Sequence, residues 1–442
     1  MPRLDVRTLE SYLREIAREA SVIPASAEVP EERLSLVPLR QVNQQSWGID
    51  TVESYSLQRG AHCAPARLWE ERVPFADEES GATKVSLDYF SDGVQRTTLL
   101  GTIPFRDFGS ESVPWQMAQI GCTVLRRGPD GALAPIPDVE QIEFLLLAPI
   151  SFLIAKTTKV SLRGALERLT VPLPTVRWID TSYNPAPDDT GTDADYKVVD
   201  GQSYPRIPNE VLFRWLGDPD RFRHHGRHWA TRMRDRMERS VHNALAKARA
   251  ADRAEYKAAS VSSLTVKDGS LRDSGGLFER SAIGLVKSLR TQYLGSDPQA
   301  VVINLPDGFR SPVFVLSRPS DSTGEAISEE TGGEPPRKKS KWLSWFLRMR
   351  PQSKVDPRFG LVRIEIDPLI LPSRGVRDQW KREDSLIISS VSRAVHRERM
   401  PSSYPDPRWG NLIYPMSVCE KYLRSRLVPH EVARHFGFVR LA

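Results

Sequence analysis

The sequence predicts an α/β fold, a mixed sheet with flanking helices, and three observations support this class. Segments rich in β-branched residues and bounded by turn residues predict strands at 84–90, 97–104 and 114–126. A long stretch with helical periodicity follows at 227–253. A further strand pattern resumes at 264–267. Strand patterns therefore stand on both sides of a long helix, which favours a mixed sheet over an all-α or all-β fold.

The remaining elements follow the same two periodicities. The early strands are joined only by short turn-like segments, DG and DFGSES, so they are expected to form an antiparallel meander. Further strands are expected at 282–287, 300–305, 313–317 and 360–366, and helices at 4–20, 208–217 and 378–399, with two more beginning near Pro415 and Pro429. These elements supply the rest of the sheet and its covering helices.

Changes in composition divide the 442 residues into four segments. Residues 1–82 form an N-terminal helical extension, residues 83–317 and 358–442 form two parts of one core, and residues 318–357 form an insert. The insert contains SDSTGEAISEETGGEPPRKKSK, which is rich in Ser, Gly, Pro and charge and is predicted to be disordered. The basic-aromatic stretch KWLSWFLRMR inside it is either a partner-docking or membrane-surface helix, or a helix packed on its own domain.

Bulk composition points to a soluble, cytoplasmic protein. Hydrophobic residues make up 40% of the chain and charged residues 27%. The longest apolar run, 144–155, is interrupted by Pro149 and is shorter than the ~20 residues of a spanning helix, and the N-terminus has no apolar signal region. The three cysteines, Cys63, Cys122 and Cys419, show no CxxC spacing, so neither a disulfide nor a structural zinc site is expected.

The net charge of +6 is concentrated in one helical stretch. Between Arg214 and Arg249, ten Arg and Lys residues stand against four acidic residues, so this stretch alone carries a net charge of +6. Clustered arginine favours contacts with phosphates, although a solvated helix face gives the same pattern. The candidate DNA-phosphate contacts in this stretch are Arg221, Arg223, Arg227 and Arg232.

Three acidic residues stand at informative positions. Asp92 follows the first strand, in SDGVQR; Glu238 lies inside the long helix; and Asp268 ends a short strand, in LTVKDGSL. An RNase H-like fold gathers its carboxylates from elements in this order. Each acid also has an ordinary explanation, because Asp-Gly is a common turn pair and Glu238 stands between Arg234 and Arg239. The ordered set of three is what favours a site.

A cluster of carboxylates of this kind points to a two-metal site for Mn²⁺ or Mg²⁺. Hydrolysis of a phosphodiester bond needs an activated water and a neutralised leaving oxygen, and two divalent ions ~3.5–4 Å apart supply both. These hard ions prefer oxygen ligands, and they relieve the repulsion between neighbouring carboxylates. The sequence therefore predicts a metal-dependent nuclease.

Several motifs resemble, in order, those of the NurA nuclease family. SDGVQRT resembles the family's first-strand DG(S)R motif, RDRMERS its Arg-x-x-x-Glu helix, and VKDGSLRDSGG…AIGLVKS its DGxL strand followed by a strand ending in Lys-Ser. FGLVRIEIDP and LIYPMSVCEKYL resemble the later Arg-x-Glu strand and the C-terminal Tyr-Pro segment. These motifs are spread over residues 84–440, with long gaps; residues 1–80 and 318–357 are not covered.

The resemblance assigns roles to individual residues. Asp92, Glu238 and Asp268 would be metal ligands, and Lys287 would contact a phosphate or orient a ligand. Arg96, in the SDGVQRT motif, joins the candidate DNA contacts. These residues form the catalytic set that the resemblance implies for a deoxyribonuclease.

The chain departs from the family pattern near its C-terminus. The family usually has an Ala-His pair on the helix after Tyr-Pro, whereas this chain has Cys419-Glu420 there. Glu420 is expected to be the fourth ligand, since a carboxylate can fill the same corner of the site as an imidazole. His430 and His435 are weaker candidates.

A histidine-rich segment, RFRHHGRHW, contains His224, His225 and His228. A zinc cluster is one interpretation, but no matching cysteine pair accompanies these residues, so a basic segment facing DNA or a partner is favoured. Trp229 in the same segment could stack on a base of single-stranded DNA, but core packing is favoured for it.

The resemblance also implies partners. Members of the family form dimers, act as exonucleases and endonucleases, and sit on a hexameric HerA-type translocase ATPase that feeds them DNA. This chain has no GxxxxGK[ST] signature, so an ATP-driven step requires a partner. DNA end processing and anti-phage defence both fit. The alternative is a weakly active or non-catalytic DNA-binding adaptor of the translocase, which the missing Ala-His pair favours and the three acids oppose.

Overall fold

The structure is a computed structural model of the chain. It describes residues 23–24, 48–51, 73–74, 85–104, 112–157, 163–164, 166–167, 176–185, 196–199, 202–252, 263–271, 281–287, 296–317, 342–353, 356–374, 376–402 and 409–429. The helices expected at 4–20 and after Pro429, and residues 318–341 of the expected insert, lie outside the described residues.

Strands of very different length build the sheet part of the fold. They are β1 (Ile23–Pro24), β2 (Gly48–Thr51), β3 (Val73–Pro74), β4 (Ser86–Pro104), β5 (Ser112–Arg127), β6 (Leu133–Pro135), β7 (Gln141–Ala148), β8 (Val176–Asp180), β9 (Tyr196–Val199), β10 (Gln202–Pro205), β11 (Ser263–Asp268), β12 (Ala282–Val286), β13 (Phe309–Arg310), β14 (Phe314–Ser317), β15 (Leu343–Arg348) and β16 (Leu361–Ile366).

The helices stand between and after these strands. The α-helices are α3 (Ile150–Lys156), α5 (Asn209–Trp215), α6 (Pro219–Asp252), α7 (Ser296–Ile303), α8 (Arg382–Arg397) and α9 (Tyr414–Arg426). Short 3₁₀ turns are η7 (Pro368–Ile370), η8 (Arg377–Gln379) and η9 (Trp409–Asn411). Among the described residues, no helix has both the length and the apolar character needed to cross a membrane.

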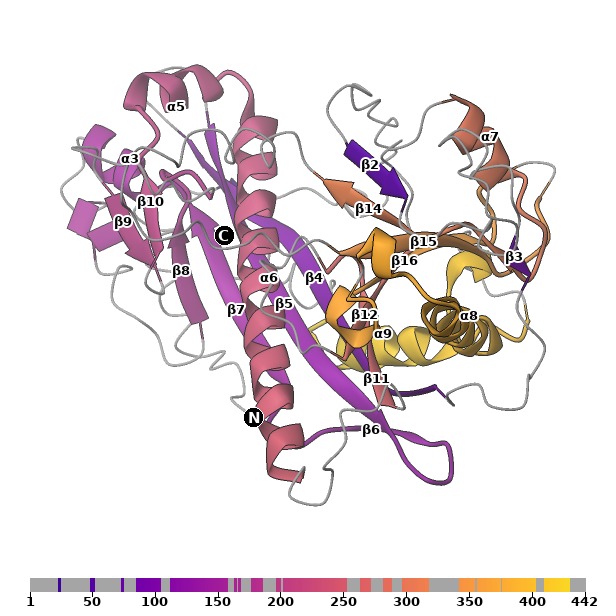
Figure 1. Cartoon of the computed structure of the whole chain (residues 1–442). Helices are drawn as coiled ribbons and strands as arrows, with labels where there is room; N and C mark the ends of the chain where they lie inside the picture. Colours follow the sequence, from indigo (N-terminus) through magenta and orange to yellow (C-terminus); the bar gives the residue numbers. More distant parts are fainter. Residues whose placement is uncertain are drawn as a thin grey trace, which may run out of the picture.

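One mixed sheet organises the fold (Figure 1), so the predicted α/β class is confirmed. Its main path runs β2-β14-β15-β16-β12-β11-β4-β5-β7-β8. Strands β4, β5 and β7 form an antiparallel meander, as expected. On the other side of β4, strand β11 pairs in parallel with β4 and β12 pairs in parallel with β11, while β16 runs antiparallel to β12. Strand β4 therefore belongs to both groups: it is an outer strand of the antiparallel meander and the first strand of the parallel group β4-β11-β12.

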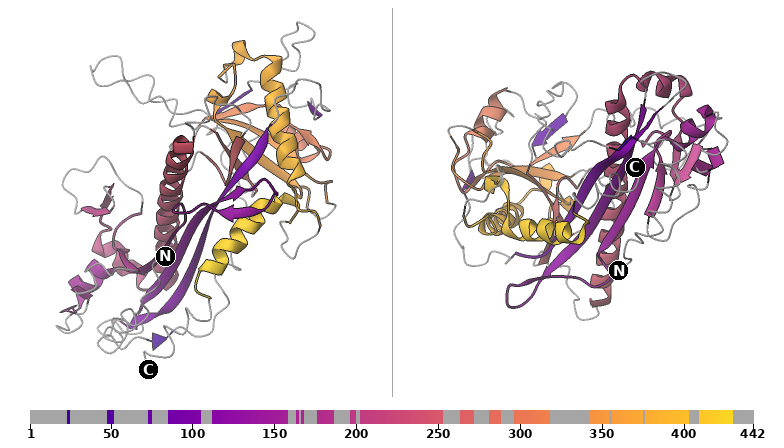
Figure 2. Two further views of the ribbon diagram at one scale, coloured as in Figure 1. Left: turned by 90° about the horizontal axis from the view of Figure 1, so that it is seen from below. Right: turned by 180° about the vertical axis from the view of Figure 1, so that it is seen from behind.

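The two faces of the sheet are covered by different helices (Figure 2). Helix α6 packs on the meander through a stripe at four-residue spacing: Trp229, Met233, Met237, Val241 and Leu245. Helices α8 and α9 pack on the opposite face. Val391 of α8 and Met416 of α9 belong to the same hydrophobic cluster as Phe90 of β4. Since successive residues of a strand point to opposite faces, β4 sends alternate side chains to α6 and to α9.

Two expected strands, 84–90 and 97–104, prove to be one continuous strand, β4. The Asp92-Gly93 pair between them was interpreted as a turn, and this was wrong. Every residue from Tyr89 to Leu99 pairs with β5, whose buried strand supplies a full ladder of partners. The turn preference of Asp-Gly is local and weak beside that pairing.

Two further local predictions were wrong. Residues 300–305, expected to be a strand, lie largely in helix α7. KWLSWFLRMR, interpreted as a helix within a disordered insert, contains the fully buried strand β15 between β14 and β16. Its side chains are buried on both faces of the sheet. Trp345 packs in the cluster that contains the buried residues of α8, and Phe346 packs beside Phe314 on the other face. A strand buried on both faces has no alternation to reveal it, so the sequence pattern resembled a helix.

Candidate functional site

Strands β4 and β11 bring two of the predicted acids together. Their parallel register pairs Lys267 with Ser91, and no β11 partner follows beyond that pair. The next residues, Asp268 and Asp92, therefore occupy corresponding positions and point to the same face of the sheet. β11 ends here, whereas β4 continues to Pro104. From Asp92 onward, this edge of β4 is left unpaired by β11.

Strand β12 adds a positive charge to the same place. Asp268 pairs with Leu285 of β12, and Lys287 stands two residues further on, so it points to the same face as Asp268. The Lys287 Nζ lies 2.9 Å from Asp268 Oδ2. After Asp268 the chain turns at Gly269, whose φ is 84° and whose N–H donates to the Leu285 carbonyl at 2.9 Å. A side chain other than glycine is disfavoured at that φ.

The charges around Asp92 leave this carboxyl short of positive partners. Its side chain is buried, and burial raises its pKa well above the usual value, with Asp268 adding to the effect. Lys287 opposes the shift, while Glu420 and Glu238 increase it. Burial on its own would lower the pKa of Lys287, but Asp268 and Asp92 raise it instead. The carboxyl groups of Asp92, Asp268 and Glu420 are therefore close enough to influence one another, with Lys287 as the cation among them.

Helix α9 brings Glu420 to the Asp92 side of the sheet. The adjacent Cys419 is buried, and its thiol donates to the Phe90 carbonyl at 3.6 Å. Burial raises the pKa of the Cys419 thiol well above its usual value, so this cysteine stays neutral. The Glu420 carboxylate forms an ion pair with Arg424 at 3.0 Å and keeps a quarter of its side chain exposed. Glu420 is thus close enough to Asp92 to influence its charge while remaining accessible.

Glu238 reaches β4 from the opposite face. Its carboxylate forms ion pairs with Arg234 at 3.4 Å and with Lys267 at 3.3 Å. A Cβ atom added at Gly93 would overlap Glu238 Oε1, so the carboxylate lies directly against the backbone beside Asp92. The sequence predicted that Asp92, Glu238 and Asp268 form one cluster. The structure brings Asp92 and Asp268 together and holds Glu238 in its own ion pairs across the strand.

Several polar residues around the site were not predicted from the sequence. Lys267 is buried and donates to the carbonyls of Asp268 and Ser270 at 3.1 and 3.2 Å. Glu365 on β16 is fully buried and accepts hydrogen bonds at 2.8 Å from the Ser270 hydroxyl and the Leu271 N–H. Both therefore hold the turn after Asp268. The sequence features that could have identified these residues are a lysine inside the apolar strand LTVKD and the two charged residues, Arg363 and Glu365, inside the apolar strand LVRIEI.

The predicted DNA-binding arginines do not form one surface. The Arg96 guanidinium donates to the Val428 carbonyl at 2.6 Å, so it supports the chain after α9. Arg221 keeps 62% of its side chain exposed and pairs with Asp218, while Arg223 is only 18% exposed and pairs with Asp220. The remaining two candidates, Arg227 and Arg232, are half-buried along α6. Of this set, Arg221 is the most accessible to a phosphate.

The histidine segment also divides between core and surface. Trp229 is buried and its Nε1–H donates to the Tyr183 carbonyl at 2.8 Å, so core packing is confirmed for it. His225 Nε2 lies 2.9 Å from the same carbonyl, and burial lowers the pKa of His225. His224 and His228 are exposed, with ring centroids 4.3 Å apart.

Metal binding at these groups can be tested against their geometry. Among the side chains that the structure describes, no three acidic, histidine or cysteine groups stand together as a ready-made metal site. On the Asp92 face, however, the donors are of the type that hard divalent ions prefer, and the burial of Asp92 among other acids leaves a deficit of positive charge. Asp92, Asp268 and Glu420 therefore fit a divalent cation in their chemistry.

A scan against protein-family models finds no match for this chain, and a search of curated proteins finds none either. The likeness to the NurA family therefore depends on the motifs quoted above, together with their order along the chain.

Proposed function

We propose that the chain is a metal-dependent deoxyribonuclease of RNase H-like architecture. The observation that carries the proposal is the juxtaposition of Asp92 and Asp268 on neighbouring parallel strands, beside Lys287 on the next one. Two carboxylates and a lysine at the point where one strand ends and its neighbour continues form a site for a metal ion and a phosphate. The site stands where β11 ends and β4 continues, and the Asp268 side chain keeps 30% of its surface exposed there.

The strand order supports the RNase H-like part of the proposal. From the meander inward the order is β7-β5-β4-β11-β12, with β5 antiparallel to both of its neighbours and β11 and β12 parallel to β4. The helix that carries Glu238 follows the meander and precedes β11. This is the sequence of elements expected for the first acid on a strand, the second on a helix and the third on a later strand.

Each residue has a separate task in the proposed reaction. Asp92, Asp268 and Glu420 would hold Mn²⁺ or Mg²⁺, which, when bound, supplies charge neutralisation and activation of water. Lys287, which pairs with Asp268 at 2.9 Å, would contact a phosphate oxygen of the DNA strand. Asp92, held by the Gly93 N–H at 2.8 Å, stays fixed in position as these partners bind.

Glu238 is assigned a task from the other side of β4. The absence of a side chain at Gly93 lets its carboxylate approach the unpaired edge where Asp92 stands. Its ion pairs with Arg234 and Lys267 must open before it can bind a second cation. In the proposed enzyme, Glu238 would be a ligand of the second cation, although it lies across β4 from Asp92 and Asp268.

Partners are proposed from the resemblance alone. A hexameric HerA-type ATPase would move DNA toward a dimer of this chain, in DNA end processing or in anti-phage defence. The sequence has no GxxxxGK[ST] signature, which is consistent with a motor supplied in trans.

The direct test is cleavage of linear double-stranded DNA by the purified full-length chain in Mn²⁺, with and without the ATPase, and with EDTA as the control. Asp92→Ala and Asp268→Ala are expected to abolish cleavage while circular dichroism and the melting temperature report a folded protein. Arg382→Ala, at an exposed position on α8, is the matched surface control. Full activity in both aspartate variants would overturn the assignment.

A second function, a DNA-binding adaptor with weak or no cleavage, is favoured by a specific observation. Asp268 and Glu238 are each paired with a resident lysine, Lys287 and Lys267, as in a structural ion-pair network. In that case the chain binds DNA and stimulates the ATPase, and neither aspartate variant changes these activities. Metal-dependent cleavage that is lost in Asp268→Ala excludes the adaptor.

A further inference from the structure

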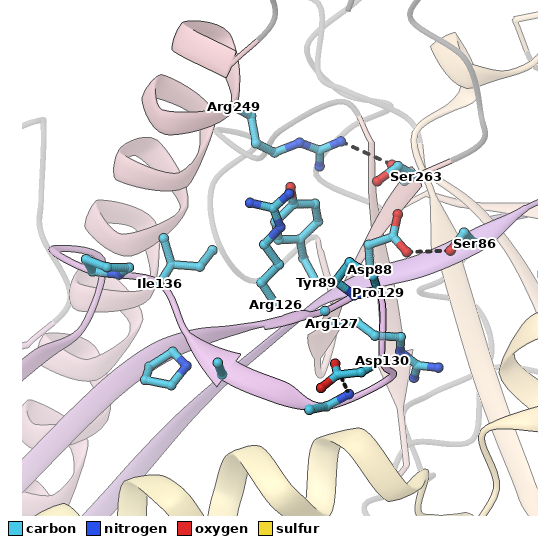
Figure 3. A pocket seen from close by; sticks show the side chains of 15 residues that line it. Ser86, Asp88, Tyr89, Arg126, Arg127, Pro129, Asp130, Ile136, Arg249 and Ser263 are labelled. Carbon is cyan, nitrogen blue, oxygen red and sulfur yellow. Dashed lines mark hydrogen bonds between the residues drawn. The ribbon is translucent and has the colours of Figure 1, made fainter.

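A cavity lies away from the aspartates, between the start of β4, the β5–β6 hairpin and the end of α6 (Figure 3). Its volume is ≈ 960 Å³, within the range of about 300–1,000 Å³ usual for small-ligand sites. Its walls combine three arginines with an aromatic ring and a proline-rich hairpin: Arg126, Arg127, Arg249, Tyr89, Pro129 and Pro135. None of these residues belongs to the site described above.

The centre of this arginine pocket is the pair formed by Arg126 and Tyr89. They are cross-strand partners on β5 and β4, and the Arg126 guanidinium carbon lies 6.0 Å from the centroid of the tyrosine ring. Arg249 at the end of α6 approaches the same ring at 4.7 Å. Figure 3 shows the Arg126 guanidinium beside the tyrosine ring and the Arg249 guanidinium above them, directed toward Ser263. Two positive groups thus converge on one aromatic side chain.

The other charges of the pocket are engaged locally. Arg249 donates to Thr265 Oγ1 at 3.1 Å and to the Ser263 carbonyl at 3.2 Å, and Arg127 forms an ion pair with Glu398 at 2.8 Å. Asp130 accepts from the Ala132 N–H at 3.0 Å within the hairpin turn. These contacts hold the walls in place.

Asp88 accepts a hydrogen bond from the Ser86 hydroxyl, so the second carboxylate of the pocket is also used locally. Arg126 is the exposed arginine of the wall, and its guanidinium lies over the Tyr89 ring. The wall thus holds three arginines and two aspartates, and both carboxylates are used by hydrogen bonds within the wall. The exposed guanidinium of Arg126 is therefore available to an anionic group next to an aromatic ring.

We propose that the arginine pocket binds one nucleotide, with its phosphate on Arg126 and Arg249. The N–H groups of a guanidinium match the oxygens of a phosphate, and the apolar hairpin residues offer a surface for a base. Tyr89 precedes Asp92 by three residues, so the pocket lies about 10 Å along β4 from the aspartates and on the opposite, α6-covered face of the sheet. The inference that this nucleotide belongs to the DNA strand being processed rests on the proposed function.

The test measures binding of the full-length chain to a fluorescein-labelled 12-nucleotide oligo(dT) by fluorescence anisotropy, in EDTA so that no cleavage occurs. Arg126→Ala is expected to raise the Kd about tenfold, by loss of a charge-assisted contact. It should also reduce the slope of log Kd against log salt by about 0.7, the value for one phosphate contact on a single strand. Arg126→Glu should weaken binding further. Arg382→Ala, on the exposed start of α8, should bind as the unchanged chain does.

Free dTMP distinguishes the two sources of the nucleotide. If dTMP displaces the oligonucleotide from the unchanged chain but not from Arg126→Ala, the pocket binds a free nucleotide. If oligonucleotide binding depends on Arg126 but dTMP does not displace the oligonucleotide, the pocket binds the DNA strand. Oligonucleotide and dTMP binding unchanged in folded Arg126→Ala and Arg126→Glu would overturn the proposal. Cleavage in Mn²⁺ is scored separately: an inactive chain whose binding still depends on Arg126 would refute the nuclease and keep the pocket.

Discussion

The ammonium group of Lys287 lies 2.9 Å from the carboxylate of Asp268, and this ion pair occupies the place where the proposed metal would bind. The Lys287 side chain is nearly buried, while Asp268 keeps 30% of its side chain exposed. The lysine therefore neutralises part of the charge that Asp268 and Asp92 share. A divalent cation would take over the same task with more charge.

Replacing Lys287 makes this exchange measurable. Lys287→Met is expected to lower the free energy of unfolding by about 1–3 kcal/mol in EDTA, since the acids then lose their one close cation. Mn²⁺ should restore more stability to this variant than it adds to the unchanged chain. Urea unfolding with and without Mn²⁺ provides the measurement. An equal effect of Mn²⁺ on both proteins would mean that the metal does not occupy the position of the lysine.

Glu420 is expected to matter less for cleavage than Asp268. Its carboxylate is shared with Arg424 on the same helix, whereas Asp268 pairs with Lys287 beside Asp92. Glu420→Ala should therefore reduce the cleavage rate in Mn²⁺ without abolishing it, while Asp268→Ala abolishes it. Arg424→Ala, which removes the ion-pair partner and keeps the carboxylate, is the matched control. If Glu420→Ala cleaves at the full rate over a Mn²⁺ titration, Glu420 is not a ligand.

Glycine at position 93 is expected to be required by the carboxylate of Glu238. Gly93→Ala should lower the free energy of unfolding by about 1–3 kcal/mol, because the added methyl group overlaps Oε1 of a side chain held by two ion pairs. In a Glu238→Ala background the same change should cost less, which gives a coupling energy of about 1 kcal/mol.

Gly121→Ala is the control on the neighbouring strand. A Cβ there meets only ordinary van der Waals neighbours at 3.5 Å or more, so a small effect is expected. Urea denaturation of the four proteins of the Gly93–Glu238 cycle measures the coupling. Strict additivity would show that Glu238 does not lie against the strand in solution.

His242 predicts how stability depends on pH. It is buried on α6 with its Nε2 3.0 Å from the Ser91 hydroxyl, and burial, with Lys267, lowers its pKa to about 3. The unfolded chain binds a proton at this residue below about pH 6.5, whereas the folded chain does not. The contribution of His242 to stability is therefore complete above pH 6.5 and is lost as the pH falls from there toward 3, by at most about 1.4 kcal/mol per pH unit.

The measurement is urea unfolding between pH 7.5 and 4. His242→Gln removes the titration, so its free energy of unfolding should fall less steeply over that range than that of the unchanged chain. His224→Gln, at an exposed position of the same helix, should keep the original slope. A slope in His242→Gln equal to that of the unchanged chain would show that His242 does not stay neutral in the folded state.

The sequence by itself determined those parts of the protein that depend on local patterns. The stripe from Trp229 to Leu245 has the four-residue spacing of one helix face, and it predicted the main part of α6. Short apolar runs predicted β11 and β12 within a residue of their ends. Asp268-Gly269 was correctly placed at the end of a strand, where a glycine permits the positive φ of the following turn.

Only the tertiary structure decided how Asp92, Glu238 and strand β15 are used. Asp92 lies within a strand because β5 provides a partner for each residue around it, a pairing that no local pattern contains. Glu238 stands across β4 from Asp268 because the packing of α6, not the order of the acids, fixes the face on which it arrives. Strand β15 is buried on both faces and lost its alternation for that reason. Contacts between segments distant in the chain outweigh local preferences of a kcal/mol or less, and they also decide which carboxylates meet.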